Sequence, residues 1–271
     1  MKLSVIGCGY LGAVHAAAMA SLGHTVVGID VDQTKIDKLS AGQTPFYEPG
    51  LDEILRAGID SGRLTFSTDY ADLADAEVHF IGVGTPQRRD GQGADMTFVD
   101  AATDGILRYA GPGSLIAGKS TVPVGTAARL SELANAKGVR LAWNPEFLRE
   151  GFAVKDTVDP DRLVYGVADS TRDEDVATLD AVYASILERG TPRLVTNQAT
   201  AELVKVAANS FLATKISFIN AMAEISEVAG ADVTQLADAI GHDVRIGRKF
   251  LNAGVGFGGG CLPKDIRAFA A

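Results

Sequence analysis

Short apolar runs rich in valine and isoleucine alternate with longer amphipathic stretches along the first half of the 271-residue chain. Six of these runs are predicted strands, at residues 3–6, 25–29, 64–66, 78–83, 114–117 and 141–143. A later pair of runs, 162–167 and 193–196, flanks a helical stretch near 171–187 and is expected to extend the same sheet. This alternation is typical of parallel β-α-β units with helices on both faces. The sequence therefore predicts a Rossmann-like, doubly wound parallel α/β domain over residues 1–196.

Residues 199–229 follow the pattern of one long helix, with neither proline nor glycine inside it. Its apolar residues lie on more than one side, which indicates burial against a partner. A shorter helix is expected at 232–240, and another begins just after Cys261. The chain stops inside that last helix before any stop signal, so we expect a truncated chain. Residues 197–271 are accordingly predicted to form a small helical domain.

The first predicted strand leads directly into a glycine-rich turn, and a helical stretch at 13–22 follows it. Strand, turn and helix in this order are the context that a dinucleotide-binding GxGxxG motif requires. The motif places the pyrophosphate on the helix N-terminus and assigns cofactor contacts to Gly7, Gly9, Tyr10, Leu11 and Gly12. Asp30, 18 residues after Gly12, is expected to accept hydrogen bonds from the adenosine ribose, which favours NAD over NADP. Lys35 could reach the same edge of the ribose, so NADP stays possible as the cofactor.

Residues 144–151 follow the sixth predicted strand, at the edge where open parallel sheets bind ligands. Asn144 as N-cap, Pro145 in the first turn and Gly151 as terminator predict one short helix there. Glu146 and Glu150 would then share a face at i, i+4 spacing. Because two like charges on one face repel each other, their presence indicates a ligand-binding or catalytic site. The alternative is that these residues form a solvated turn.

Lys205 and Asn209 are also four residues apart, in an apolar part of the long helix. Buried donors need partners, so this pair indicates a functional cluster. The alternative is that both side chains reach solvent or a subunit contact.

Cys261 follows residues 255–260, which contain only glycine, valine and phenylalanine. Pro263 fits a first helical turn, so Cys261 lies close to a helix N-terminus, where that terminus and Lys264 favour the thiolate. Asp265 falls on the same helix face. This arrangement indicates a nucleophilic cysteine; a buried structural cysteine is the alternative.

Composition excludes several classes of function. A formal net charge of −9 argues against non-specific nucleic-acid binding. Cys8 and Cys261 lie far apart with no metal-ligand spacing, so neither a disulfide nor a metal site is expected, and Cys8 is interpreted as a small packing residue. No apolar run approaches the roughly 18 residues of a membrane span, and a cytoplasmic location is the default.

Several segments together resemble the UDP-glucose/GDP-mannose dehydrogenase family over residues 7–265. They are the glycine-rich turn, Lys-Ser-Thr-Val-Pro-Val-Gly-Thr at 119–126, Phe-Leu-Arg-Glu-Gly at 147–151, Arg-Ile-Gly at 245–247 and Phe-Leu at 250–251. The resemblance points to the branch that acts on UDP-glucose. It implies a four-electron oxidation of the sugar C6 to UDP-glucuronate by two NAD in succession.

In such an enzyme Cys261 is the nucleophile, forming a thiohemiacetal and then a thioester, while Lys205 and Asn209 stabilise the oxyanion. The resemblance further assigns the water to Thr121, Glu146 and Asp265, and cofactor contacts to Thr85, Thr121, Glu150 and Lys264. The substrate residues that it implies are Phe147, Leu148, Arg149, Glu150, Gly151, Lys205, Asn209, Arg245, Phe250, Leu251, Asn252, Ala253, Gly254 and Gly258. Arg245 would reach the sugar from a partner subunit, and the long helix would form a homodimer.

Three other functions stay open at this point. GDP-mannose or another nucleotide sugar is the nearest alternative substrate. A NAD-binding module without chemistry would need no thiolate, and a two-electron hydroxyacid dehydrogenase would need no nucleophilic cysteine. The family continues into a second Rossmann-like domain that holds the nucleotide, so we expect this chain to bind NAD and dimerise but to turn over poorly.

Overall fold

The computed structural model describes residues 1–258 and 262–270. The chain divides into two compact units. The first, called the sheet unit below, comprises residues 1–86 and 94–203, and the second, the helical unit, comprises residues 87–93 and 204–271. The division falls a little beyond the domain boundary expected near Thr196, which stays a prediction.

The sheet unit contains an eight-stranded sheet in the order β3-β2-β1-β4-β5-β6-β7-β8. Its strands are β1 (Lys2–Ile6), β2 (Thr25–Ile29), β3 (Leu64–Ser67), β4 (Val78–Ile81), β5 (Leu115–Gly118), β6 (Arg140–Trp143), β7 (Leu163–Val167) and β8 (Arg193–Asn197). Neighbouring strands pair in parallel, except that β7 runs antiparallel to β6. The predicted mostly parallel, doubly wound α/β fold is confirmed, and all eight predicted strands are present within two residues of their bounds.

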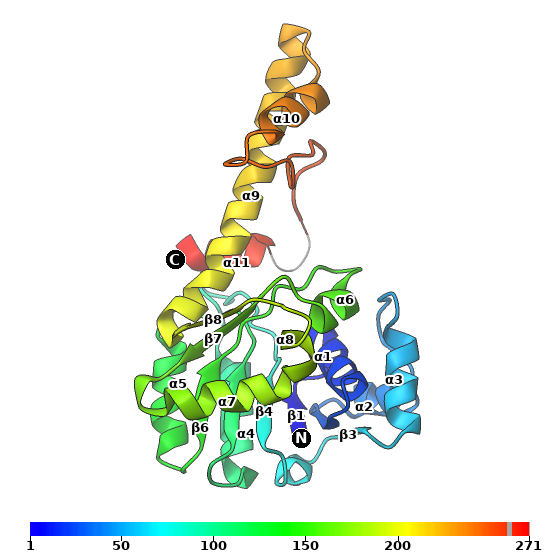
Figure 1. The fold of residues 1–271 in the computed structure, drawn as a ribbon, viewed down its shortest axis with the longest axis vertical. Helices are drawn as coiled ribbons and strands as arrows, with labels where there is room; N and C mark the ends of the chain where they lie inside the picture. The colour runs from blue at the N-terminus through cyan, green and yellow to red at the C-terminus, as the bar shows by residue number, and fades with distance from the viewer. Residues whose placement is uncertain (259–261, 271) are drawn as a thin grey trace. The chain divides into compact units, whose positions relative to one another are not determined.

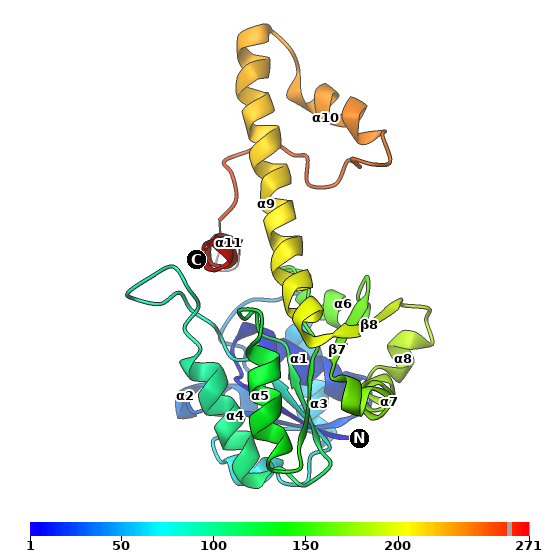
Figure 2. The ribbon, with the colours of Figure 1, turned by 90° about the vertical axis from the view of Figure 1, so that its left-hand side faces the viewer.

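Helices cover both faces of this sheet, with α4 on one side and α7 on the other (Figures 1 and 2). They are α1 (Tyr10–Ser21), α2 (Gln33–Ser40), α3 (Leu51–Asp60), α4 (Thr97–Tyr109), α5 (Thr126–Asn135), α6 (Ala153–Val158), α7 (Arg172–Val182) and α8 (Ala184–Leu187). Two short 3-10 helices lie at Tyr70–Leu73 and Asp169–Thr171. The helix predicted near 171–187 is therefore two helices, separated at the fully buried Tyr183.

Burial on both faces explains why the central strands have no alternating pattern. Every residue of β4 and β5 is buried, as expected for parallel strands that helices cover on both sides. Packing is close at the end of β5, where a Cβ on Gly118 would lie 2.2 Å from the ring of Trp143 on the paired strand β6. Glycine at 118 thus makes room for the largest side chain of the core.

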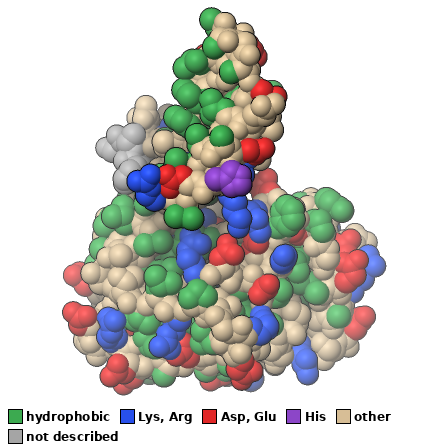
Figure 3. Space-filling model, turned by 45° about the horizontal axis from the view of Figure 1, so that its top comes forward, with side chains coloured by type: hydrophobic (Ala, Val, Ile, Leu, Met, Phe, Trp, Pro, Cys, Tyr) green, Lys and Arg blue, Asp and Glu red, His purple; other side chains and the backbone are tan. Residues whose placement is uncertain are grey.

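The long helix α9 (Gln198–Ala229) starts in the sheet unit and continues as the main element of the helical unit. α10 (Val233–Gly241) and α11 (Leu262–Ala270) follow, so the three predicted helices are confirmed. Asp232 caps α10 by accepting hydrogen bonds from the backbone N–H of Thr234 at 2.7 Å and of Gln235 at 3.1 Å. Hydrophobic side chains spread along the visible face of this unit (Figure 3).

Among the described residues no helix is both long and apolar enough to cross a membrane.

Candidate dinucleotide and catalytic sites

The three glycines of the turn between β1 and α1 differ in the space around them. Gly7 has a φ of 90°, and a Cβ there would lie 2.9 Å from the Cα of Val83. A Cβ on Gly12 would lie 1.8 Å from the carbonyl oxygen of Gly7. No atom lies within 4 Å of where a Cβ on Gly9 would be, so space is open just before the first residue of α1. A helix N-terminus beside open space fits a dinucleotide pyrophosphate.

Asp30 is buried directly after β2 and faces this turn. Its carboxylate accepts the backbone N–H of Cys8 at 2.8 Å and of Asp32 at 3.0 Å. The Nζ of Lys35 lies 2.7 Å from the same carboxylate. Lys35, the cation that could have bound the 2′-phosphate of NADP, is therefore paired with Asp30, the carboxylate that favours NAD.

Cys8 is buried inside the glycine-rich turn. Burial, and next the negative charge of Asp30, raise the pKa of its thiol far above the ordinary value. This side chain is a neutral packing group, in agreement with its interpretation from the sequence.

Two loops meet where β4 and β5 end. The hydroxyl of Thr85 donates to the carbonyl oxygen of Thr121 at 2.8 Å, and the hydroxyl of Ser120 donates to that of Val83 at 2.6 Å. The structure thus brings Thr85 and Thr121, two predicted cofactor residues, together at the carboxyl edge of the sheet.

The short helix expected over residues 144–151 is wrong, because an irregular segment leads from β6 to α6 there. Asn144 does not cap a helix; its side chain is buried. Its Oδ1 accepts from Lys119 Nζ at 3.0 Å and from the Tyr183 hydroxyl at 2.6 Å, and its Nδ2 donates to Val164 at 3.0 Å. Tertiary hydrogen bonds to this amide replace the local cap that the sequence suggested.

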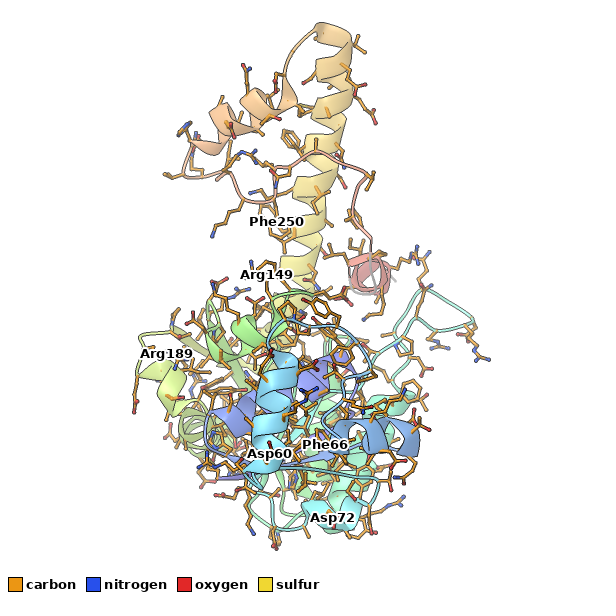
Figure 4. The ribbon with its side chains drawn as sticks, turned by 90° about the vertical axis from the view of Figure 1, so that its right-hand side faces the viewer. Asp60, Phe66, Asp72, Arg149, Arg189 and Phe250 are labelled. Atoms are coloured by element: carbon orange, nitrogen blue, oxygen red, sulfur yellow. The ribbon has the colours of Figure 1, made fainter. Side chains whose placement is uncertain are left out.

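Glu146 and Glu150 therefore do not share a helix face. The Glu146 carboxylate accepts the backbone N–H of Leu148 at 2.5 Å, whereas Glu150 is exposed. Arg149, labelled in Figure 4 on the segment that leads to α6, holds Asp156 through two guanidinium nitrogens at 2.6 and 2.9 Å. The guanidinium of Arg162 lies 3.8 Å from the centre of the Phe147 ring.

Glu48, between α2 and α3, was not among the predicted site residues. It is 4 % exposed and accepts three hydrogen bonds, from the Tyr10 hydroxyl, the Gly151 N–H at 2.9 Å and the Ala153 N–H at 2.8 Å. It joins the glycine-rich turn to the 147–151 segment. An acid in a turn-rich stretch carries no sequence signal for such burial.

Glu202, in the first turns of α9, is a second missed residue. Its carboxylate accepts the N–H of Gly125 at 2.8 Å and of Ala127 at 2.6 Å. Burial raises the pKa of Glu202, and these hydrogen bonds oppose the rise. Glu202 thereby fixes the end of the Lys-Ser-Thr-Val-Pro-Val-Gly-Thr segment.

The helical unit brings three predicted site residues together. Asn209 Nδ2 on α9 donates to one carboxylate oxygen of Asp265 at 2.7 Å, and Lys264 Nζ lies 2.6 Å from the other. Lys205 lies one turn before Asn209 on α9. Cys261 lies outside the described residues.

The other predicted substrate residues of this unit lie between α10 and α11. Arg245 is exposed and holds Asp243 at 2.6 and 3.0 Å. Phe250, labelled in Figure 4, has a left-handed φ of 65°. Leu251 is buried against Ile219 of α9, so only its backbone is available to a ligand. Asn252 and Ala253 are exposed, and the N–H of Gly254 donates to Asn220 at 2.8 Å. Among the described residues, no atom lies within 4 Å of where a Cβ on Gly258 would be.

Comparisons with known proteins agree with this geometry. Residues 1–238 match the model of the "UDP-glucose/GDP-mannose dehydrogenase family, NAD binding domain". The UDP-glucose 6-dehydrogenase of Rickettsia typhi is 46 % identical over 99 % of this chain and 62 % of its own length. A UDP-glucose dehydrogenase structure from Pyrobaculum islandicum has a TM-score of 0.91 at 43 % identity, over 99 % of this chain and 62 % of its own.

A GDP-mannose dehydrogenase structure from Pseudomonas aeruginosa has a TM-score of 0.83 at 32 % identity, over 100 % of this chain and 64 % of its own. The chain thus spans about three fifths of the length of the curated UDP-glucose 6-dehydrogenases that it matches.

Proposed function

The chain belongs to the UDP-glucose/GDP-mannose dehydrogenase family and uses NAD, and from this membership we propose that the full-length protein oxidises UDP-glucose to UDP-glucuronate. The observation that carries the proposal is the 46 % identity, over nearly the whole chain, to a UDP-glucose 6-dehydrogenase. The open space at Gly9 supports it, because a dinucleotide phosphate requires that room.

NAD would lie along the carboxyl edge of the sheet, with its pyrophosphate on the N-terminus of α1 and its adenosine ribose at Asp30. When bound, NAD supplies the hydride acceptor. Thr85, Thr121, Glu150 and Lys264 complete the proposed cofactor contacts. The hydrogen bond between the Thr85 and Thr121 loops supports this assignment for two of the four.

The proposed chemistry removes two hydrides from the sugar C6. The alcohol first loses a hydride and a proton and becomes an aldehyde, and the Cys261 thiolate then adds to that carbonyl carbon. Loss of the second hydride from carbon, together with the hydroxyl proton, converts the thiohemiacetal into a thioester. Water cleaves the thioester, releasing the carboxylate and the thiol.

Lys205 and Asn209 would donate hydrogen bonds to the oxyanion that forms on the Cys261 adduct. The Asn209 side chain has two N–H donors, and one of them is directed at Asp265. Asp265 would in turn hold the hydrolytic water, together with Thr121 and Glu146. Its contact with Lys264 keeps the carboxylate oriented.

We further assign the sugar nucleotide to residues 147–151, to 250–254 and Gly258, and to Arg245 of a second copy. A homodimer through α9 is part of this proposal. Phe211, Phe218 and Ile225 on this helix are 65 %, 46 % and 57 % exposed within one copy, which supports a partner over that surface.

GDP-mannose, or another nucleotide sugar, is the second candidate substrate, favoured by the likeness to the GDP-mannose dehydrogenase structure. An assay of NADH formation with each of the two nucleotide sugars, side by side, decides between the two candidates. Faster NADH formation with GDP-mannose than with UDP-glucose would replace the first proposal.

The deciding experiment counts NADH formed per UDP-glucose by the full-length protein in excess NAD, beside Cys261→Ser. We expect two NADH per sugar from the parent and a severe loss in the variant. Cys8→Ala is the matched control, because it removes the other thiol, and it should keep the ratio of two. One NADH per sugar, or an unchanged Cys261→Ser variant, would overturn the thioester route and favour a two-electron dehydrogenase.

A further inference from the structure

Glu48 links two segments that the proposed function assigns to different ligands. One oxygen of its buried carboxylate accepts the Tyr10 hydroxyl and the Gly151 N–H, and the other accepts the Ala153 N–H. The Gly151 N–H also lies 3.3 Å from the Tyr10 hydroxyl oxygen. Three donor groups from two distant parts of the chain thus meet around one carboxylate.

Tyr10 belongs to the cofactor side of this cluster. It is the first residue of α1 and part of the glycine-rich turn, so its backbone lies where the pyrophosphate would bind. Its ring packs against Phe46 with 4.8 Å between ring centres. Burial, and next the hydrogen bond to Glu48, raise the pKa of the Tyr10 hydroxyl far above its ordinary value, so it remains a donor at neutral pH.

Gly151 and Ala153 belong to the substrate side. Gly151 closes the proposed sugar-binding segment, and Ala153 is the first residue of α6. The N–H of Arg149 donates to Asp156 within α6 at 3.0 Å, so the segment and the helix are joined at a second point. What fixes Gly151 and Ala153 therefore also fixes the backbone of residues 147–150.

We propose that Tyr10 and Glu48 are positioning residues that couple the two ligands: NAD at the glycine-rich turn orders residues 147–153 through the Tyr10–Glu48 hydrogen bond and so tightens binding of the sugar nucleotide. The inference rests on the proposed function for the identity of the second ligand. By linkage, the sugar nucleotide tightens binding of the cofactor by the same factor.

The two residues make different contributions, which their variants separate. Tyr10→Phe removes only the hydroxyl, so Glu48 still holds Gly151 and Ala153 while its link to the turn is lost. Glu48→Gln replaces one acceptor oxygen with an N–H donor group, which cannot accept from a backbone N–H. It should loosen residues 147–153 even without a ligand.

The test measures the dissociation constant of UDP-glucose for the full-length protein with and without NADH, which cannot oxidise the sugar. NADH should lower the constant about tenfold in the parent, the factor of one charge-assisted hydrogen bond, and by a factor near one in Tyr10→Phe and Glu48→Gln. Glu53→Gln, an exposed glutamate on α3, is the matched control and should behave as the parent.

Hydrogen exchange of a peptide covering residues 147–153 gives a second readout that needs no sugar nucleotide. NADH should slow exchange in the parent and leave it unchanged in Tyr10→Phe. An equal effect of NADH in parent and Tyr10→Phe, or none in the parent, would overturn the coupling. A parent that fails to oxidise UDP-glucose would instead refute the proposed function, and the exchange measurement would still decide the coupling.

Discussion

Two alanine substitutions in the glycine-rich turn should separate cofactor binding from folding. A methyl group on Gly12 would lie 1.8 Å from the carbonyl oxygen of Gly7, and ordinary contacts of this kind begin at 3.4 Å. The obstacle is backbone rather than a flexible side chain, so the turn and α1 would have to move apart. Overpacking of this kind costs about 3 kcal/mol, which corresponds to a fall of roughly 6–12 °C in Tm for a protein of this size.

A methyl group on Gly9 meets no atom within 4 Å, and the φ of −71° suits any residue. Alanine as N-cap in place of glycine costs less than about 1 kcal/mol, so Tm should fall by only a few degrees. The methyl group would occupy the space proposed for the pyrophosphate. Loss of one or more hydrogen bonds to that charged group, about 1.5–3 kcal/mol, should raise the NAD dissociation constant roughly 10- to 100-fold.

Thermal unfolding by circular dichroism and calorimetric titration with NAD measure both effects. Gly91→Ala is the control, because Gly91 is exposed and equally uncrowded but lies outside the turn. If Gly9→Ala binds NAD as tightly as the parent, the space above Gly9 does not receive the pyrophosphate. If Gly12→Ala keeps the parent Tm, the argument from close contact is refuted.

Two further substitutions test the charge at the cofactor site and the burial of a histidine. Asp30→Ala should weaken NAD binding about tenfold. It should also free Lys35 to bind the 2′-phosphate of NADP, so the ratio of the NADP dissociation constant to the NAD dissociation constant should fall. An unchanged ratio would contradict this expectation. Burial lowers the pKa of His79 to about 4. Between about pH 6.5 and pH 4 the unfolded chain binds a proton at this ring and the folded chain does not, so roughly 3 kcal/mol of the free energy of unfolding is lost as the pH falls toward 4. Urea unfolding of His79→Gln should depend less on pH than that of the parent over this interval, and equal slopes would refute the assignment.

The sheet could be predicted from the sequence because its strands are buried on both faces. Such strands are short and mostly apolar, as in β5 and, apart from His79, in β4, and each is closed by glycine or polar residues. The antiparallel pairing of β7 with β6 could not be predicted, because the pattern within a strand does not state its direction. The long helix was equally clear, since neither proline nor glycine interrupts it.

The segment after β6 shows where local signals fail. Asn144, Pro145 and Gly151 carry the signals of a short helix, yet the Asn144 amide is surrounded by Lys119 and Tyr183 and cannot cap. Those two partners are 25 and 39 residues away in the chain. Tertiary contacts therefore override a local preference that is worth only about 1 kcal/mol.

Within the helical unit, the predicted inward-facing Asn209 has its partner in Asp265, 56 residues later. The spacing of Lys205 and Asn209 indicated that partners were needed but not which ones. In the same way, nothing near Glu48 in the sequence indicates that it accepts amides 103 and 105 residues away. Sequence patterns identify elements, while these long-range hydrogen bonds follow only from the packed fold.

Three acids of the sheet unit share one arrangement that explains how its ligand-facing loops are held. Asp30, Glu48 and Glu202 are each buried, and each accepts two backbone N–H groups from loops that follow β-strands or from the first turns of the helices after them. Such backbone lies beyond the sheet, whose ladder cannot satisfy its amides, and side-chain carboxyl oxygens supply the acceptors instead. The glycine-rich turn and the segment after β5 are thereby held before a ligand arrives, whereas the proposed coupling lets NAD order the segment after β6 further. Preorganisation of this kind lowers the ordering cost of binding, so acids with no direct place in the chemistry can still contribute to the site.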